Sequence, residues 1–209
     1  QVAVTLAPGE TREVVFTLGL ADDRAGALRL ARRYRRPAAV EAAWRRTRRF
    51  WAGLFAPLEV KTPDPAFDLL TNTWLKYQTL SSRVWGRTGY FQPGGAFGYR
   101  DQLQDSQVFL PLDPRRTRAQ ILLHAAHQFR DGTTWHWWHP LTGEGAKKPY
   151  NDDLLWLPFV TLTYLRETAD FAALRERVPF LGPGGRPSRE RGTLYEHCRR
   201  AIDTFWTRL

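Results

Sequence analysis

The sequence predicts a mainly helical protein in which helices alternate with long polar and aromatic loops. From about residue 22 onward, apolar residues recur at spacings of three and four in successive stretches. Asp and Pro stand where several of these stretches begin, as they do at helix N-termini. Loops of this length are uncommon unless they are functional. We therefore expect an (α/α) toroid, with paired helices around a cleft and the polar loops at one end. No pattern of a parallel sheet follows residue 20.

The composition is that of a globular chain with an unusual aromatic content. Of 209 residues, 43% are hydrophobic and 25% charged, and nine are Trp and twelve Phe. This aromatic content suits a large core, a sugar-binding cleft, or both. No apolar run approaches the roughly 20 residues of a membrane span, and no signal peptide is evident. Cys198 alone allows no internal disulfide, which favours a reducing compartment, and we expect a cytoplasmic protein.

The net charge of +10 is concentrated in one stretch. Residues 24–49 contain ten Arg and a single acidic residue, Glu41. Such a stretch could be an arm that binds a polyanion, or a solvated helix face. We adopt the solvated face and expect no nucleic-acid partner.

Three regions are expected along the chain. In residues 1–20, the segments 2–6 and 12–18 alternate like the strands of a hairpin, which we interpret as the end of a β-sandwich. Residues 21–58 form an Arg-rich helical linker, interrupted at Pro37. Residues 59–209 begin a helical barrel. Because the chain contains no Met and stops within a helical pattern, we expect both ends to be cuts.

Five helices are predicted in the barrel region, with Pro/Gly-rich or aromatic loops between them. Their approximate ranges are 64–82, 101–110, 113–129, 152–168 and 193–209, and the loops include 86–99, 131–150 and 179–192.

The first segment with the residues for chemistry runs from Tyr90 to Asp105. Its glycines allow the backbone to approach a ligand closely. Arg100, Asp101 and Asp105 follow, and a carboxylate can accept hydrogen bonds from two sugar hydroxyls. The alternative is structural, with Asp101 capping a helix and Arg100 pairing with Asp105. The residue types do not separate the two.

The second segment combines Trp135–Pro140 with residues 151–156. Indole faces stack on pyranose rings while polar groups bind the hydroxyls, and the candidates here are His136, Trp137, Asp152 and Asp153. The other interpretation, a Trp cluster in the core, is less favoured because two His lie among these Trp. Asp101, Asp105, Asp152 and Asp153 are also the candidates for a carboxylate pair that hydrolyses glycosides.

Metal and thiol chemistry are not expected. The pairs His124/His127 and His136/His139 lack the Cys or Glu partners of zinc motifs. Cys198 lies in a predicted amphipathic helix, and we expect its thiol to be inert.

Several strings together resemble the glycoside hydrolase family 94 phosphorylases, formerly glycosyltransferase family 36, and above all the β-1,2-glucan branch. They are YFQPGGAFGYRDQLQD (residues 90–105), HAAHQF (124–129), WHWWHP (135–140) followed by TGEG (142–145), and NDDLLWLP (151–158). The likeness runs from about Thr62 to Leu209. It implies a partial (α/α)6 barrel, preceded by the end of a β-sandwich and a helical linker.

The resemblance implies an inverting enzyme in which inorganic phosphate, the co-substrate, attacks the anomeric carbon while an Asp protonates the leaving oxygen. That Asp belongs to a Trp-Asn-Asp motif which these 209 residues lack, so no catalytic residue is assigned and the chain alone is expected to be inactive. Asp101 corresponds to the carboxylate that binds the donor sugar. Gly95 stands where cellobiose-type members have Arg, which favours the β-1,2-glucan branch.

The expected parent is thus an inverting phosphorylase of a β-linked, preferably β-1,2-linked, glucan that releases a sugar 1-phosphate. Its partners are the glucan and the rest of the same chain, and no other cofactor is expected. A homodimeric parent and its attachment to the inner membrane are left open. Two alternatives remain: an inverting hydrolase of a related toroid, and a non-catalytic helical module that binds a polyanion.

Overall fold

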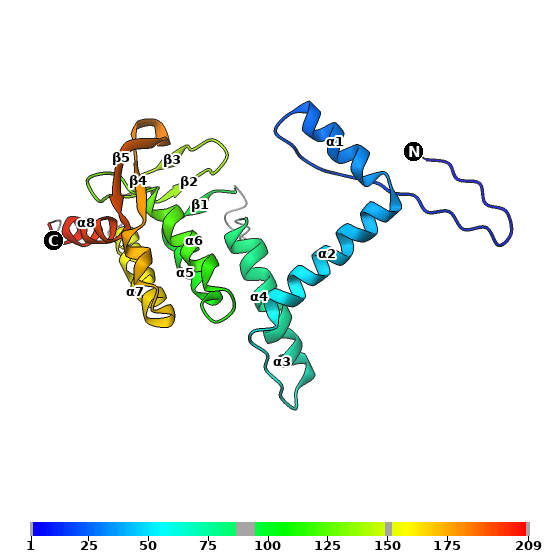
Figure 1. Cartoon of the computed structure of the whole chain (residues 1–209), viewed down its shortest axis with the longest axis horizontal. Helices are drawn as coiled ribbons and strands as arrows, with labels where there is room; N and C mark the ends of the chain where they lie inside the picture. Colours follow the sequence, from blue (N-terminus) through cyan, green and yellow to red (C-terminus); the bar gives the residue numbers. More distant parts are fainter. Residues whose placement is uncertain (1, 87–94, 149–151, 208–209) are drawn as a thin grey trace. The chain divides into compact units, whose positions relative to one another are not determined.

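The computed structural model describes residues 2–86, 95–148 and 152–207. It divides into two compact units, residues 1–53 and 54–209, which are described separately (Figure 1). Within the described residues, no helix is both long enough and apolar enough to cross a membrane.

The first unit contains the two helices predicted for the Arg-rich region. Helix α1 spans Arg24–Tyr34, and α2 spans Pro37–Phe55 and so reaches into the second unit. Asp23 caps α1, because its side chain accepts a hydrogen bond of 2.6 Å from the Gly26 amide. Pro37 begins the next helix, where its missing N–H is not needed. The predicted interruption at Pro37 is confirmed.

The hairpin predicted for residues 2–6 and 12–18 is wrong for this chain. The described residues before α1 contain a turn at Pro8–Gly9 but no strand. Their apolar side chains are exposed, with Phe16 at 79% and Leu18 fully exposed. Two strands with no further sheet to pack against are marginal in water, so their alternating pattern does not suffice to pair them.

A continuous helix opens the second unit, in the order α3 (Pro65–Leu69), η1 (Leu70–Trp74), α4 (Leu75–Gln78) and η2 (Thr79–Val84). Asp64 caps it as predicted, and η1 and η2 are π-helical. Lys76 is buried in it and donates hydrogen bonds to the carbonyls of Phe55 and Leu58, which ties the end of α2 to this helix.

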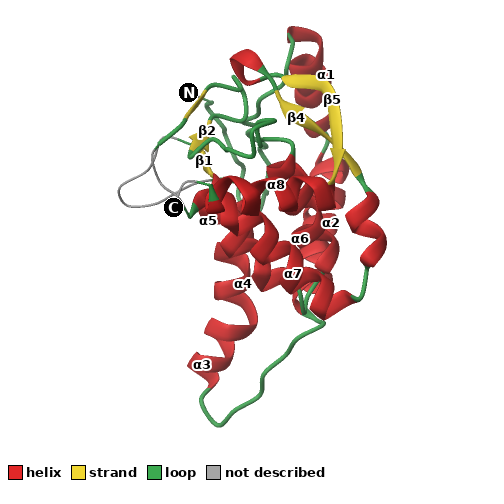
Figure 2. Cartoon of the chain, turned by 90° about the vertical axis from the view of Figure 1, so that its left-hand side faces the viewer, coloured by secondary structure: helices red, strands yellow, loops and turns green. Residues whose placement is uncertain are grey.

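The remaining helices pack around a shared core (Figure 2). It is built from apolar side chains of the four longer helices together with Trp138, Ala173 and Val178. Their bounds are α5 Tyr99–Ser106, η3 Gln107–Phe109, α6 Pro114–Ala125, η4 Asp153–Leu155, α7 Trp156–Thr168, η5 Phe171–Arg175 and α8 Leu194–Trp206. Thr193 and Glu196 form a capping box at the start of α8. The mainly helical prediction is confirmed.

Two small antiparallel sheets lie at one end of these helices (Figures 1 and 2). The first has the order β1 (Phe97–Gly98), β2 (Trp137–Trp138), β3 (Gly145–Ala146). The second pairs β4 (Arg177–Leu181) with β5 (Pro187–Thr193) across the short η6 (Pro183–Gly185). The prediction of a loop over 179–192 is therefore wrong. Its prolines and glycines lie at strand ends, at a register shift and in the connecting turn, where a ladder tolerates them.

Candidate functional site

Three chain segments meet at the end of the helices where β1 and β2 lie. They are the first turn of α5, the residues around β2, and η4. The Tyr99 amide donates to the carbonyl of His136 at 3.0 Å, directly after the pairing of Gly98 with Trp137. On the other side of β2, the amide of His136 donates to the Ala146 carbonyl at 2.8 Å. These bonds bring the glycine-containing loop and the tryptophan-containing loop to the same place.

His136 and Asp153 form a partly buried polar contact in this site. Nδ1 of His136 lies 2.7 Å from Oδ2 of Asp153. Asp153 is only 4% exposed. Its burial raises the pKa of the Asp153 carboxyl, an effect that the bond to His136 opposes and the charges of Asp152 and Asp101 reinforce. Asp101 is half-buried on the first turn of α5, so its carboxylate shares this environment without being sealed inside.

Arg100 and Asp152 form a second contact at the rim of the site. Nη1 of Arg100 donates to Oδ2 of Asp152 at 2.9 Å, and the guanidinium lies 5.1 Å from the centre of the Trp156 ring. The indole N–H of Trp156 is 3.4 Å from the same carboxylate oxygen. Both partners of the ion pair are half exposed, so the pair orders the start of α5 against α7 more than it stabilises the fold.

Asp105 faces another partner. Its Oδ2 accepts from Nε of Arg83 at 2.7 Å, which connects α5 to the end of η2. The proposed pairing of Arg100 with Asp105 is therefore not the one that forms. One turn earlier, the buried Gln102 donates to the carbonyls of Arg83 and Val84, both at 3.2 Å. Sequence reasoning did not single out Gln102. The one feature of the sequence that could have indicated this role is the position of its uncharged amide between Asp101 and Asp105.

The three tryptophans of the 135–138 segment have different environments. Trp138 is 1% exposed and is part of the core, where it stacks on His127 at 4.0 Å between ring centres and meets His124 edge-on. Trp137 alternates to the other face of β2 and is half-buried beside His139. Trp135 packs on Gly145, where a Cβ atom would lie 2.8 Å from the indole. The core interpretation thus holds for Trp138. The ring of Trp137 meets His139, whereas the indole of Trp156 contacts Arg100 and Asp152.

Of the remaining histidines, His124 and His197 are buried and His127 and His139 are half-buried, and Cys198 is buried as well. Nδ1 of His124 and of His127 each lie 2.7 Å from the backbone carbonyl one turn before, and His197 bonds Gln128 and the Val178 carbonyl. Burial raises the pKa of Cys198 to about 11. Among the described residues, no cluster of three or more His, Cys, Asp or Glu could hold a metal ion.

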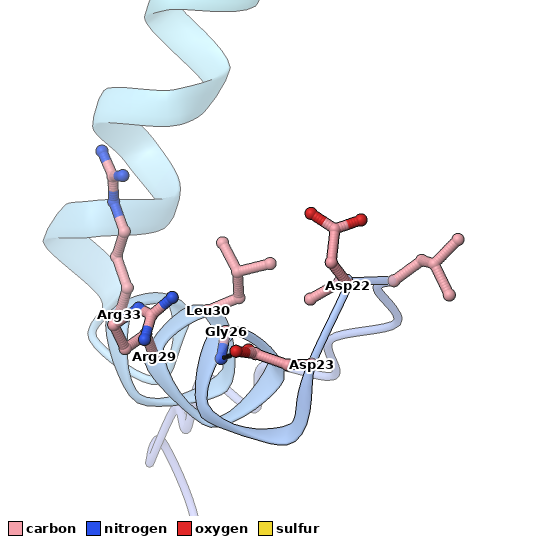
Figure 3. Close-up of a pocket in the computed structure, with 8 residues that line it drawn as sticks. Asp22, Asp23, Gly26, Arg29, Leu30 and Arg33 are labelled. Atoms are coloured by element: carbon pink, nitrogen blue, oxygen red, sulfur yellow. Dashed lines mark hydrogen bonds between the residues drawn. The ribbon is translucent and has the colours of Figure 1, made fainter. Parts of the chain in front are cut away.

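A hollow of about 570 Å³ lies elsewhere, within the first unit. It is bordered by the segment around Asp22 and Asp23 and by one side of α1, which presents Arg29 and Arg33 (Figure 3). The Asp23 carboxylate is used as the helix cap, through its hydrogen bond with the Gly26 amide (Figure 3). The hollow contains none of the predicted site residues, and we assign it no role.

Two family models match successive parts of the chain. Residues 50–209 match the family described as "Glycosyl hydrolase 94 superfamily, catalytic domain", and residues 1–37 match "Glycosyl hydrolase 94, supersandwich domain".

Curated relatives align with most of the chain. The cyclic beta-(1,2)-glucan synthase NdvB of Rhizobium meliloti is 38% identical over 96% of this chain and 8% of its own length. The solabiose phosphorylase of Paenibacillus borealis is 31% identical over 95% of this chain and 24% of its own. The 1,2-beta-oligoglucan phosphorylase of Listeria innocua is 28% identical over 55% and 11%. The chain therefore spans a quarter or less of these relatives.

Proposed function

Because the chain belongs to the glycosyl hydrolase 94 superfamily, we propose that it forms part of the donor-sugar site of an inverting glycoside phosphorylase. In this proposal the whole enzyme cleaves a β-linked glucan with inorganic phosphate and releases a sugar 1-phosphate. The present residues bind the sugar, and the proton donor lies in a part of the enzyme outside them.

The observation that carries the proposal is the convergence of Asp101 with His136 and Asp153 at one end of the helices. Hydrogen-bond acceptors of two kinds, carboxylates and an imidazole, lie there, and the half-buried indole of Trp156 lies at the rim against Arg100 and Asp152. A pyranose needs this combination, since its ring presents C–H groups on its faces and hydroxyls around its edge.

Exposed apolar side chains support a larger helical barrel around this unit. They lie on the 65–84 helix and on α7, and the largest are Phe67, Leu69, Leu70, Trp74, Leu75, Phe159 and Leu162. Patches of this kind on a helical surface are typical of faces that pack against further elements. In the proposed (α/α)6 toroid, these faces contact helices of the same domain.

A β-1,2-linked glucan is the substrate we propose. Two relatives, the Rhizobium synthase and the Listeria phosphorylase, are named for β-1,2-glucans. Gly95 has a φ of +70° and an open environment, so an Arg at this position would be strained. This supports a β-1,2-glucan as the substrate rather than the cellobiose of members that have Arg at this position. We propose a cytoplasmic enzyme, in keeping with phosphate as co-substrate.

The test is sugar binding by the chain, with Asp101→Asn as the variant. We expect β-1,2-gluco-oligosaccharides to shift amide resonances of residues 97–101 and 136–138, and the variant to bind about tenfold more weakly, because a charged acceptor is lost. Asp203→Asn on the exposed face of α8 is the matched control. Equal binding by both variants would refute the assignment of Asp101.

The reaction is tested on the full-length parent. Phosphate-dependent release of sugar 1-phosphate is expected from the parent and none from the present chain. Phosphate-independent release of free sugar would instead establish a hydrolase.

A further inference from the structure

We propose that Asp153 is a positioning residue, whose buried carboxylate holds the His136 ring so that its Nε2 accepts a hydrogen bond from a sugar hydroxyl beside Asp101. This inference rests on the proposed function. It also separates the roles of two residues that the sequence grouped together as substrate-binding.

Burial distinguishes the two side chains. Asp153 is 4% exposed, whereas the side chain of His136 is 35% exposed, and the two are joined by the 2.7 Å contact between Nδ1 and Oδ2. A carboxylate this deep, with one oxygen already bonded to an imidazole, does not reach a ligand at the surface. His136 lies between it and solvent, so any effect of Asp153 on a sugar passes through the imidazole.

The contact fixes the tautomer of His136. An ionised carboxylate can only accept hydrogen bonds, so Nδ1 must carry the proton. In the neutral imidazole, Nε2 is then an acceptor. Free histidine prefers the opposite tautomer, with the proton on Nε2, which would present a donor. Asp153 thus decides which kind of group His136 offers to a hydroxyl.

The backbone of His136 is fixed as well. Its amide donates to Ala146 on the β3 side and its carbonyl accepts from Tyr99 at the start of α5. With the backbone held on both sides and the ring held by Asp153, the imidazole keeps its place next to the first turn of α5, where Asp101 lies. In this proposal, the imidazole of His136 and the carboxylate of Asp101 accept hydrogen bonds from two neighbouring hydroxyls of one pyranose ring.

The tautomer is measured first, by ¹⁵N NMR of the ligand-free chain labelled at histidine. We expect the Nδ1–H form for His136 at neutral pH, and a return to the Nε2–H form in Asp153→Leu, which keeps the volume and removes the acceptor. Asp153→Ala provides a second variant if the Leu variant does not fold. An Nε2–H tautomer in the wild-type chain would overturn the proposal without any variant.

Sugar affinity is measured second. We expect Asp153→Leu and His136→Ala each to weaken binding of a β-1,2-gluco-oligosaccharide about tenfold, and the double variant to be no weaker than either, because both remove the same hydrogen bond. Additive losses would overturn the proposal, as would unchanged affinity in Asp153→Leu. The control is Asp203→Asn, expected to bind like wild type.

The two measurements also separate this inference from the proposed function. A wild-type chain that keeps the Nδ1–H tautomer but binds no β-glucan would refute both the donor-sugar site and the sugar contact of His136. The positioning of the ring by Asp153 would remain in place.

Discussion

Replacement of His124 by Phe should change how the chain responds to acid. His124 is completely buried, with Nδ1 on the Gln120 carbonyl and its ring edge-on to Tyr99 and Trp138. Burial is the main reason that its pKa falls from 6.5 to about 3. Between these values the unfolded chain binds a proton at His124 and the folded chain does not. Stability is therefore lost as the pH falls from 6.5 towards 3.

The size of the effect follows from the displaced pKa. Each pH unit in this window removes about 1.4 kcal/mol of unfolding free energy, so His124 contributes a loss of about 2.7 kcal/mol by pH 4.5. His124→Phe keeps the ring but loses one hydrogen bond, which costs about 1 kcal/mol at pH 7. At pH 4.5 the variant should therefore be more stable than wild type by about 1.7 kcal/mol, the difference between these two terms.

Urea unfolding followed by Trp fluorescence at pH 7 and pH 4.5 measures this reversal. The pKa values of His127 and His197 are also lowered by burial, but both residues remain in the two proteins and cancel in the comparison. Ile121→Val, in the same core, is the control and should reduce stability by about 1 kcal/mol at both pH values. Parallel losses for wild type and His124→Phe would refute the reasoning.

Three further predictions concern buried groups outside the site. Lys76→Met should lower the unfolding free energy by about 2–3 kcal/mol in urea titrations, because the carbonyls of Phe55 and Leu58 lose a charged donor; an unchanged midpoint would contradict this role. Gly132→Ala should lower the melting temperature by several degrees, since φ is +82° and the added Cβ would overlap Thr204; full thermal stability would show that α8 moves aside. Cys198 should resist a thiol reagent at pH 8 until urea unfolds the chain, because burial keeps its thiol protonated and covered; rapid labelling of the native chain would show otherwise.

The helices could be read from the sequence because their signals are local. Asp64 and Asp113 precede Pro at the first helical position, and Pro37 separates two helices. The strands could not, since β1, β2 and β3 have two residues each and exist through pairing between distant segments. The hairpin of β4 and β5 was hidden for the same reason, since its Pro, Gly and Glu residues have low strand propensity.

The sequence indicated which loops would lie close together, but not how their charged residues would pair. The sequence indicated that the loops around Asp101 and His136 would meet, and they do. It could not assign partners, because Asp105 bonds Arg83, 22 positions away, and Arg100 bonds Asp152, 52 positions away. The sequence shows which side chains are charged, but the packing of the helices determines which of them lie close enough to pair.

The anchoring of Trp138 has a consequence for how the neighbouring residues meet a ligand. The segment between α6 and η4 is long in sequence. The strand pairs from β1 to β3 and the buried Trp138 indole divide its described part into short loop segments with fixed ends. Short loop segments with fixed ends have little conformational entropy left to lose when a ligand binds. We therefore expect the surface next to Asp101 to be largely formed before the proposed sugar binds. A substitution that removes a methyl group from the core next to Trp138 should then weaken sugar binding even though no residue at the rim of the site is changed.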